Sequence, residues 1–280
     1  MNTQIIVGDC LDRLKELPES SVQCCITSPP YWGLRNYQVD DQLGQEETPE
    51  EFVTNLVEVF REVRRVLRDD GTLWLNLGDS YNGSGGAGGD YNTGGIKEGQ
   101  PKYKGRNVQT LKPKDLVGIP WNKPNPMPES VKDRCTKSHE YIFLLTKSRQ
   151  YYYDHEAIKE RAVHDGMPDR RTYDGKWKDE EHQAAFKIMN GMRNKRSVWT
   201  VTTKPYKGAH FAVFPEKLIE PCVLAGCPKG ETILDPFAGS GTTGLVAKRH
   251  GCNFIGIELN PEYAELARNR IAQEQEGMFS

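Results

Sequence analysis

Short apolar runs alternate with amphipathic stretches near both ends of the chain, and this alternation predicts its secondary structure. Consecutive apolar residues are typical of strands buried on both faces, and apolar residues three and four positions apart are typical of helices with one buried face. A capping box of Thr48 and Glu51, with Pro49 in the first helical position, marks one helix start, and Asn260 followed by Pro261 marks another. The predicted strands are 5–7, 22–26, 72–77, 140–146, 150–153, 232–234 and 253–257, and the predicted helices are 11–17, 49–70, 215–224, 242–250 and a last one from 261.

The alternation of strands and helices indicates an α/β fold. Strands connected through helices run parallel, and a parallel sheet is covered by helices on both faces. With 280 residues, the chain is long enough to bury a sizeable core. Two segments lack the pattern. Segment 81–112 is rich in glycine and predicts a mobile functional loop, and segment 154–206 is polar and predicts an inserted module outside the sheet.

Basic residues gather in two stretches, although the whole chain carries a formal charge of −2. Residues 97–114 contain six basic residues and one acidic residue, and residues 149–207 contain thirteen basic and nine acidic residues. Such a local excess is typical of a surface that contacts a polyanion. Charge alone is equally compatible with lysines and arginines that merely solvate exposed loops.

The seven cysteines and six histidines show neither disulfide nor metal-ligand spacing. The number of cysteines is odd and no two of them are separated by two residues, so we expect no disulfide framework and no zinc site, and we place Cys24 and Cys25 in the core. The chain starts without a basic and then apolar leader, and it has no apolar run of membrane-spanning length. We therefore expect a cytoplasmic protein that holds no metal and contacts no membrane.

A glycine-rich turn follows the predicted strand 232–234. The stretch ILDPFAGSGTTG places Gly239, Gly241 and Gly244 between this strand and a helix, and Glu258 ends the next strand. Glycines at these positions let the backbone approach a ligand at a helix N-terminus, and the carboxylate is placed for ribose hydroxyls. A nicotinamide dinucleotide and S-adenosylmethionine both carry such a ribose, so the turn alone does not choose between them.

Two further features favour S-adenosylmethionine. A nicotinamide-binding domain normally begins with this unit, whereas here only a short stretch follows Thr242, so strands from the start of the chain must complete the sheet. In addition, Asp235 places a carboxylate just before the turn. The free amino group of S-adenosylmethionine could use this carboxylate, and a nicotinamide dinucleotide has no such amine.

The predicted strand 22–26 ends in the unusual loop Ser28-Pro29-Pro30-Tyr31. Ligands of open α/β sheets bind beyond the carboxyl ends of the strands, so we expect this loop and the glycine turn at one rim. The two prolines make the loop rigid. The Ser28 hydroxyl and the Pro29 carbonyl are then placed to accept hydrogen bonds from an exocyclic amine, while the Tyr31 ring stacks on a planar base. Such bonds would aim the lone pair of the amine at a methyl sulfonium.

In this order, the motifs resemble those of the β-type amino-group DNA methyltransferases, which methylate cytosine N4 or adenine N6. The matching segments are 27–32, 235–243 and 254–258, and segments 7–10 and 210–215 are similar as well. The resemblance implies a Rossmann-like, circularly permuted methyltransferase sheet that uses S-adenosylmethionine. It implies catalytic roles for Ser28, Pro29, Pro30 and Tyr31, and cofactor contacts for Asp9, Cys10, Phe214, Asp235, Pro236, Phe237, Gly239, Ser240, Gly241, Thr242 and Glu258.

The resemblance also implies an organisation and a substrate. It divides the chain into a catalytic half at 1–153, a target-recognition region at 154–206 and a cofactor-binding half at 207–280. The implied substrate is double-stranded DNA whose target base leaves the duplex, and a cognate restriction endonuclease is a further conceivable partner. In the family, a serine at the first loop position is mostly associated with cytosine N4. Ser28 therefore predicts N4-methylcytosine, with N6-methyladenine as the alternative.

One departure from the family lies between segments 118–121 and 123–126. Family members usually carry a helix and an edge strand there, whereas Asn122 alone separates the two segments here, so we expect a shortened sheet edge. Two other hypotheses stay open. Pro221-Cys222 is the dipeptide of a cytosine-C5 nucleophile, although it lies in a predicted helix, and a non-catalytic nucleic-acid-binding protein could retain the same fold.

Overall fold

The computed structural model describes residues 1–32, 39, 42–78, 118–124, 138–162, 192–203 and 214–274. Most of the strands in these ranges belong to one sheet, and β6 (Glu160–Arg161) and β7 (Met192–Arg193) form a separate pair. The strands of the sheet are β1 (Thr3–Val7), β2 (Val22–Thr27), β3 (Leu67–Leu77), β4 (Gly118–Asn122), β5 (His139–Thr146), β8 (Trp199–Thr200), β9 (Thr232–Asp235) and β10 (Asn253–Glu258). Their spatial order is β1-β10-β9-β2-β3-β5-β4-β8.

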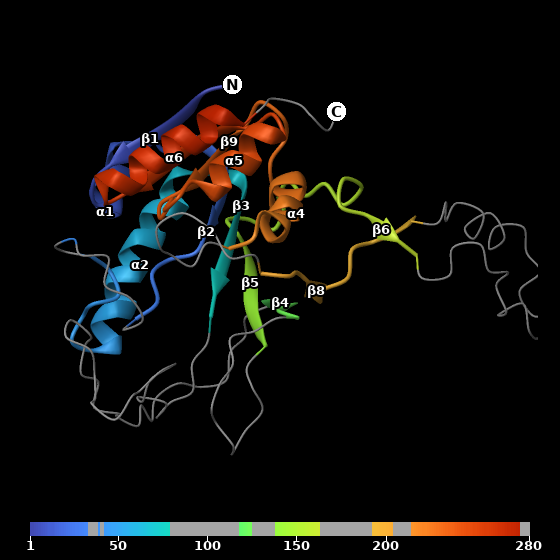
Figure 1. Cartoon of the computed structure of the whole chain (residues 1–280), viewed down its shortest axis with the longest axis horizontal. Helices are drawn as coiled ribbons and strands as arrows, with labels where there is room; N and C mark the ends of the chain where they lie inside the picture. Colours follow the sequence, from blue (N-terminus) through green and yellow to red (C-terminus); the bar gives the residue numbers. More distant parts are fainter. Residues whose placement is uncertain are drawn as a thin grey trace, which may run out of the picture.

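The sheet interleaves strands from the two ends of the chain, as the sequence predicts. From β1 to β3 all neighbours run parallel, and the carboxyl-terminal strands β9 and β10 lie between the amino-terminal strands β1 and β2. In Figure 1 the colours of the two ends of the chain therefore meet in this part of the sheet. Neither end of the chain can form the parallel core without the other.

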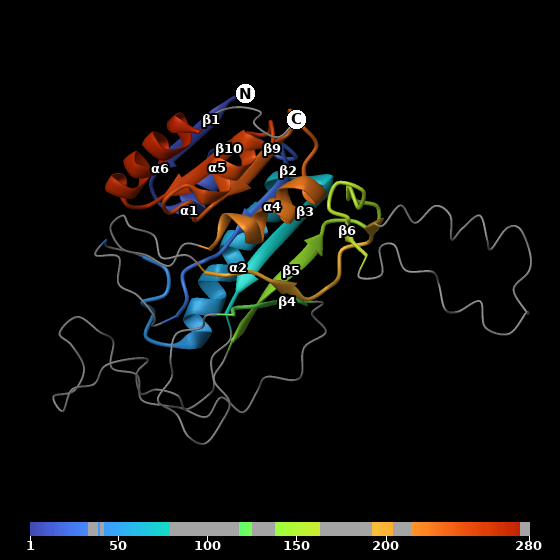
Figure 2. The ribbon, with the colours of Figure 1, turned by 45° about the vertical axis from the view of Figure 1, so that its right-hand side comes forward.

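Helices cover the sheet on both faces, and side chains alternate between two hydrophobic cores. Along β2, Cys24 belongs to one core and Cys25 to the other, and Ile233 and Leu234 divide in the same way along β9. Both cysteines are fully buried, as predicted. The first core is closed by α4 (Glu216–Gly226), α5 (Thr242–Arg249) and α6 (Pro261–Gln273), and the second by α1 (Cys10–Glu16) and α2 (Pro49–Val66). Figure 2 shows α4 and α5 in front of the sheet and α2 behind it.

The prediction of a shortened sheet edge is wrong. Strand β4 itself lies beside β5 and pairs with it antiparallel, from Gly118 opposite Phe143 to Asn122 opposite His139. Strand β8 then adds to the outer side of β4 in parallel. Residues 118–122 thus supply the strand beside β5 that seemed to be missing from the sequence.

Two predicted element boundaries are also corrected. The α2 helix ends at Val66, and β3 already begins at Leu67, because the apolar residue at position 67 fits both the helix spacing and the start of a buried strand. Segment 150–153 is not a strand paired with β5. Instead, the Tyr152 amide donates to the Asp70 carbonyl at 2.9 Å and the Asp154 amide donates to the Ala225 carbonyl at 2.9 Å.

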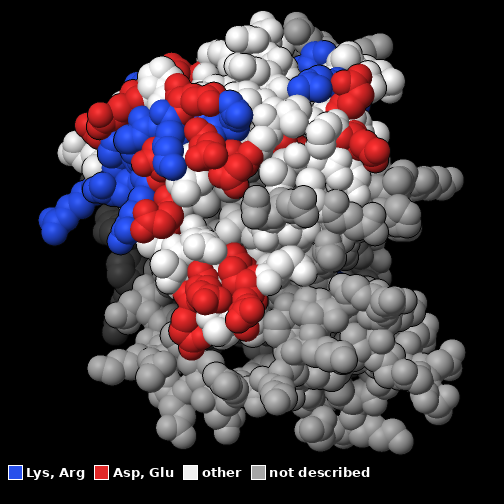
Figure 3. Space-filling model, turned by 90° about the vertical axis from the view of Figure 1, so that its left-hand side faces the viewer, with Lys and Arg blue, Asp and Glu red and all other residues white. Residues whose placement is uncertain are grey.

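Segment 81–112 and the whole of the basic stretch 97–114 lie outside the described residues, as does much of 154–206. On the face shown in Figure 3, basic and acidic side chains of the described residues lie side by side in the upper part, and a group of acidic side chains lies below them. Ion pairs within one turn of a helix include Arg13 with Glu16 and Arg268 with Glu265. No helix in the described ranges is long and apolar enough to cross a membrane.

Gly244 provides a test of the packing between α5, α6 and β10. A Cβ atom at this position would lie 2.5 Å from the Ile271 Cδ1 atom and 2.5 Å from the Phe254 ring. Overpacking costs about 1–3 kcal/mol, which exceeds the ~1 kcal/mol that alanine gains in helix propensity. We expect Gly244→Ala to lower the free energy of unfolding measured in urea, and Asn269→Ala on the exposed face of α6 to change it by less than about 0.5 kcal/mol. An unchanged unfolding midpoint for Gly244→Ala would contradict this packing.

Candidate active site

The Ser-Pro-Pro-Tyr loop and the glycine turn lie at one rim of the sheet, as predicted. Strand β2 runs parallel to β9, so the residue that ends β2, Thr27, lies beside Asp235 at the end of β9. Strand β10 ends at Glu258, which pairs with Val7 at the end of β1. The carboxyl ends of four neighbouring parallel strands thus meet at the place where open α/β sheets bind their ligands.

Asp235 joins the end of β2, which leads into the Ser-Pro-Pro-Tyr loop, to the glycine turn. Its Oδ1 accepts hydrogen bonds from the Thr27 hydroxyl at 2.7 Å and from the Phe237 amide at 3.1 Å, and its Oδ2 accepts from the Thr243 hydroxyl at 2.6 Å. The side chain is 1% exposed, and burial raises its pKa to about 6 despite these bonds. The carboxylate is therefore engaged by the protein itself and holds β2, β9 and the start of α5 together.

The glycine turn leaves open space on one side and packs closely on the other. Gly239 has a φ of +51°, and a Cβ atom there would meet nothing within 4 Å. Gly241, the N-cap of α5, has a φ of +76°, and its Cβ would lie 2.8 Å from the Ala267 Cβ. The backbone is therefore open for a ligand at the first glycine, whereas the second permits the approach of α6.

Glu258 fixes the open side of the turn. Its Oε2 accepts from the Gly239 amide at 2.8 Å, and its Oε1 accepts from the Asn260 amide at 2.9 Å. Burial raises its pKa, and the backbone hydrogen bonds oppose that rise. A carboxylate oxygen has more than one acceptor position, so these bonds leave capacity for ribose hydroxyls.

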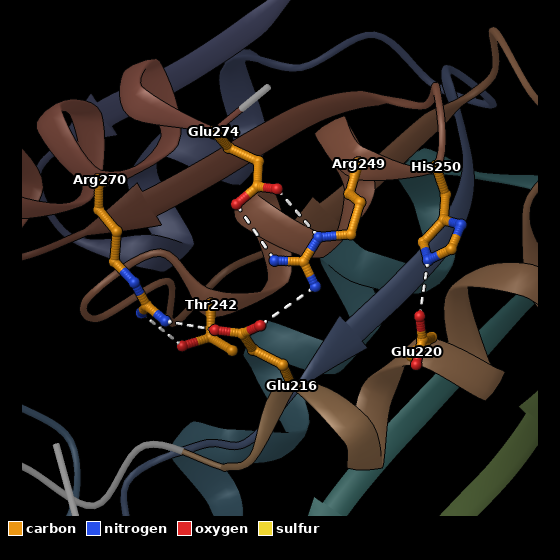
Figure 4. Close-up of polar contacts among 7 residues, drawn as sticks. All are labelled: Glu216, Glu220, Thr242, Arg249, His250, Arg270 and Glu274. Carbon is orange, nitrogen blue, oxygen red and sulfur yellow. Dashed lines mark hydrogen bonds and ion pairs between the residues drawn. The ribbon is translucent and has the colours of Figure 1, made fainter. Parts of the chain in front are cut away.

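Arg270 in α6 binds the glycine turn, and no pattern in the sequence predicts this contact. Its guanidinium donates to the Ser240 carbonyl and hydroxyl, both at 3.3 Å, and to the Thr242 hydroxyl at 2.8 Å. It also pairs with Glu216 at the start of α4, which in turn pairs with Arg249 (Figure 4). The side chains of Ser240 and Thr242 are thus held by α6, and the same network ties α4 to the turn.

The other predicted cofactor residues lie in structural positions at or near this rim. Asp9 caps α1, because its Oδ1 accepts from the Asp12 amide at 3.1 Å. Cys10 is buried, and burial raises the pKa of its thiol to about 12. Pro236 is buried, whereas Phe237 and Phe214 are half-buried and pack against opposite cores. Residues 210–213, which precede Phe214, lie outside the described residues.

The Ser-Pro-Pro-Tyr loop rests on a group of polar side chains that we call the Glu140 cluster: Ser28, Tyr31, Asn76, Lys123 and Glu140. The Tyr31 ring packs against Gly78, where a Cβ atom would lie 2.8 Å from the ring. Its hydroxyl donates to Glu140 Oε2 at 3.3 Å, and burial and the charge of Glu140 raise its pKa well above the usual value. Pro29 is buried and Pro30 is half-buried, so the loop is packed on the protein.

Asn76, Lys123 and Glu140 carry no motif in the sequence. Asn76 lies in β3, and Glu140 lies at the start of β5, which runs antiparallel to β3 and therefore begins at the rim where the parallel strands end. Lys123 follows β4 and forms an ion pair with Glu140. Only the antiparallel direction of β5 brings these side chains under the loop.

The alternative nucleophile is not at the rim. Cys222 lies inside α4 after Pro221 and is 0% exposed. Burial raises the pKa of its thiol well above the usual value, so the reactive thiolate is disfavoured. This position is wrong for a cytosine-C5 nucleophile. Among the described residues, no group of three histidine, cysteine or acidic side chains is placed to hold a metal ion.

Comparisons with known proteins show the family to which the chain belongs. Residues 22–269 match the model of the N6/N4 methyltransferase family, described as DNA methylase. The chain is 46% identical over 293 residues to the type II methyltransferase M.Cfr9I of Citrobacter freundii, and the alignment covers 95% of this chain and 87% of that protein.

Solved structures show the same fold. TTHA0409 from Thermus thermophilus, in a complex with S-adenosyl-L-methionine, has a TM-score of 0.58 and 28% identity and covers 97% of this chain and 95% of its own. The PvuII DNA methyltransferase, named as cytosine-N4-specific, has a TM-score of 0.62 and 18% identity and covers 100% of this chain and 96% of its own.

A glycine turn and a Ser-Pro-Pro-Tyr loop at one rim of such a sheet define an S-adenosylmethionine-dependent methyltransferase. The chain belongs to the N6/N4 DNA methylase family and is a DNA methyltransferase. This result confirms the family resemblance of the sequence motifs and the cofactor. It replaces the hypotheses of a nicotinamide enzyme and of a non-catalytic binding protein.

The buried carboxylate of Asp235 gives the fold a defined pH dependence. Its pKa of about 6 in the folded protein exceeds the ordinary value of 3.8, so between these values the folded state binds more protons than the unfolded chain. Its contribution is therefore most favourable below about pH 4, and on the order of 2–3 kcal/mol is lost as the pH rises to about 6.

The measurement compares the wild-type protein with Asp235→Asn, which cannot titrate at this position. We expect the unfolding free energy of the wild type, relative to Asp235→Asn, to fall between about pH 4 and pH 7 and to stay level above about pH 7. A difference between the two proteins that is independent of pH would show that Asp235 titrates normally in the folded state.

Proposed function

We propose that this protein methylates the N4 atom of cytosine in DNA, and that the Ser28 hydroxyl oxygen accepts a hydrogen bond from the target amine. The observation that carries the proposal is the position of Ser28. It directly follows the strand that Asp235 ties to the glycine turn, and Asn76 Nδ2 donates to its hydroxyl oxygen at 3.4 Å. A neutral hydroxyl at this place suits the small and electron-poor amine of cytosine.

The chemistry needs positioning rather than a strong base. Ser28 Oγ and the Pro29 carbonyl accept the two hydrogens of the amine, which turns the nitrogen lone pair away from the ring. S-adenosylmethionine, when bound, supplies the electrophilic methyl group. The amine proton becomes acidic only once the nitrogen carries the methyl group, so a direct in-line displacement without a covalent enzyme intermediate is sufficient.

The residues at the glycine turn fit the cofactor. Open space at Gly239 admits the ligand close to the backbone, and Glu258 keeps acceptor capacity for the ribose hydroxyls beside it. Asp9 and Cys10 at the end of β1 are assigned to the adenine, and Phe214 to the methionine end. Asp235 serves chiefly to hold the turn, because its three hydrogen bonds come from the protein itself.

The substrate is double-stranded DNA, read mainly by region 154–206, which lies between the catalytic half at 1–153 and the cofactor half at 207–280. The target base must leave the duplex to reach Ser28, because pairing otherwise engages its amine. The type II name of its relative M.Cfr9I supports a role in restriction and modification, with a cognate endonuclease as partner.

The methylated atom is tested by nucleoside mass spectrometry of DNA treated with the protein. We expect N4-methylcytosine from the wild type and little product from Ser28→Ala, which removes one acceptor of the amine. The control variant Ser148→Ala alters a hydroxyl that bonds only to the Gln150 carbonyl among the described contacts and should keep the wild-type rate. N6-methyladenine as the sole product would refute the cytosine assignment and leave the fold and the cofactor intact.

The cofactor assignment is tested by calorimetry with S-adenosylmethionine. Loss of hydrogen bonds to a charged group costs about 1.5–3 kcal/mol, so Glu258→Ala should weaken binding roughly tenfold or more. Glu265→Ala on the exposed face of α6 is the matched control and should bind like the wild type. Because Glu258 also holds the Gly239 amide, thermal unfolding of both variants is measured alongside. Wild-type affinity in Glu258→Ala would remove this residue from the site.

A further inference from the structure

The Glu140 cluster has a defined direction of hydrogen bonding. Glu140 Oε1 pairs with Lys123, and Glu140 Oε2 receives the Tyr31 hydroxyl and the Asn76 amide nitrogen, both at 3.3 Å. An ionised carboxylate only accepts hydrogen bonds. Asn76 must therefore turn its NH2 group toward Glu140, and the Tyr31 hydroxyl must direct its proton there.

This direction extends to the catalytic serine. Asn76 Nδ2 also lies 3.4 Å from both Ser28 Oγ and Tyr31 Oη, so with one of its two hydrogens directed to Glu140 the other is shared between these two hydroxyl oxygens. Since the Tyr31 hydroxyl directs its proton to Glu140, its oxygen presents only an acceptor toward Ser28. A hydrogen bond between the two hydroxyls can therefore run only from Ser28 to Tyr31, which in turn donates to Glu140.

The consequence is an acceptor on Ser28. A hydroxyl has one proton and two lone pairs. With the proton of Ser28 directed to Tyr31 and one lone pair facing Asn76, the remaining lone pair is the one available to a substrate. A serine whose proton pointed the other way would offer its hydrogen to the amine and would repel the amine's own hydrogens.

We propose that Glu140 is a positioning residue that acts through Tyr31 to fix Ser28 as a hydrogen-bond acceptor for the substrate amine. The inference rests on the proposed role of Ser28 and applies to either amine substrate. The site suits this role because the side chains of Glu140 and Lys123 are only 18% and 22% exposed, which limits competition from water. Lys123 holds the carboxylate in place through the ion pair with Glu140 Oε1.

The test compares two variants that differ only at position 140, where one keeps an oxygen acceptor and the other has none. Glu140→Gln with Lys123→Met keeps an amide oxygen and has no ammonium group to compete for it. Glu140→Ala with Lys123→Met has neither charge nor acceptor. We expect the single-turnover rate of methyl transfer from labelled S-adenosylmethionine to be at least about tenfold lower for the alanine variant, with the dissociation constant of S-adenosylmethionine equal within about twofold. Equal rates in the two variants would overturn the proposal.

Tyr31→Phe tests the route by removing a single oxygen atom. It should lower the single-turnover rate about tenfold, and in its background the alanine and glutamine variants should react equally fast. A persistent difference would show that Glu140 does not act through Tyr31, and an unchanged rate for Tyr31→Phe alone would refute the route even if the other variants fail to fold. His139→Ala, the exposed neighbour on β5, is the control and should keep the wild-type rate.

The same assay separates the two proposals. Mass spectrometry of the wild-type product identifies the methylated nucleoside. An adenine product would refute the proposed cytosine target and leave the role of Glu140 to be decided by the rates. A cytosine-N4 product together with equal rates in the matched variants would uphold the proposed function and refute the inference.

Discussion

The site depends on one buried carboxylate, that of Asp235, at the point where the two ends of the chain meet. Its oxygens bind Thr27 at the end of β2 and Thr243 in the first turn of α5, which are 216 positions apart in the sequence (243 less 27). A charge that is 1% exposed persists in the fold because three hydrogen bonds offset part of the cost of its desolvation. The carboxylate thereby sets the position of the Ser-Pro-Pro-Tyr loop relative to the glycine turn.

This constraint suits a reaction that depends on geometry. An in-line transfer requires the amine and the methyl donor at a fixed distance and angle, and the two loops proposed to hold them come from opposite ends of the chain. The interleaved sheet supplies the coarse alignment, since β2 and β9 are parallel neighbours. Asp235 then locks the two loops that follow these strands, and Arg270 braces the glycine turn against α4 and α6.

The change from parallel to antiparallel pairing at β5 is the second feature with functional consequences. Parallel strands present their carboxyl ends to the rim, whereas β5 presents its beginning, and Glu140 is the second residue of this strand. A charged side chain at that position reaches the Ser-Pro-Pro-Tyr loop from the side opposite to the glycine turn. The sheet therefore places the Ser-Pro-Pro-Tyr loop between the glycine turn and the Glu140 cluster.

The sequence by itself determined the helices with strong caps, the parallel core and both motif loops, because capping boxes, apolar runs and glycine turns are local signals. It did not determine strand β4, whose five residues resemble a loop until β5 pairs with them. Nor did it reveal Glu140, which meets Tyr31 across 109 positions, or Arg270, whose helical spacing looks like that of any exposed arginine. Such contacts carry no local pattern, because the partner of a polar side chain is decided only when the strands and helices that hold both residues have packed together.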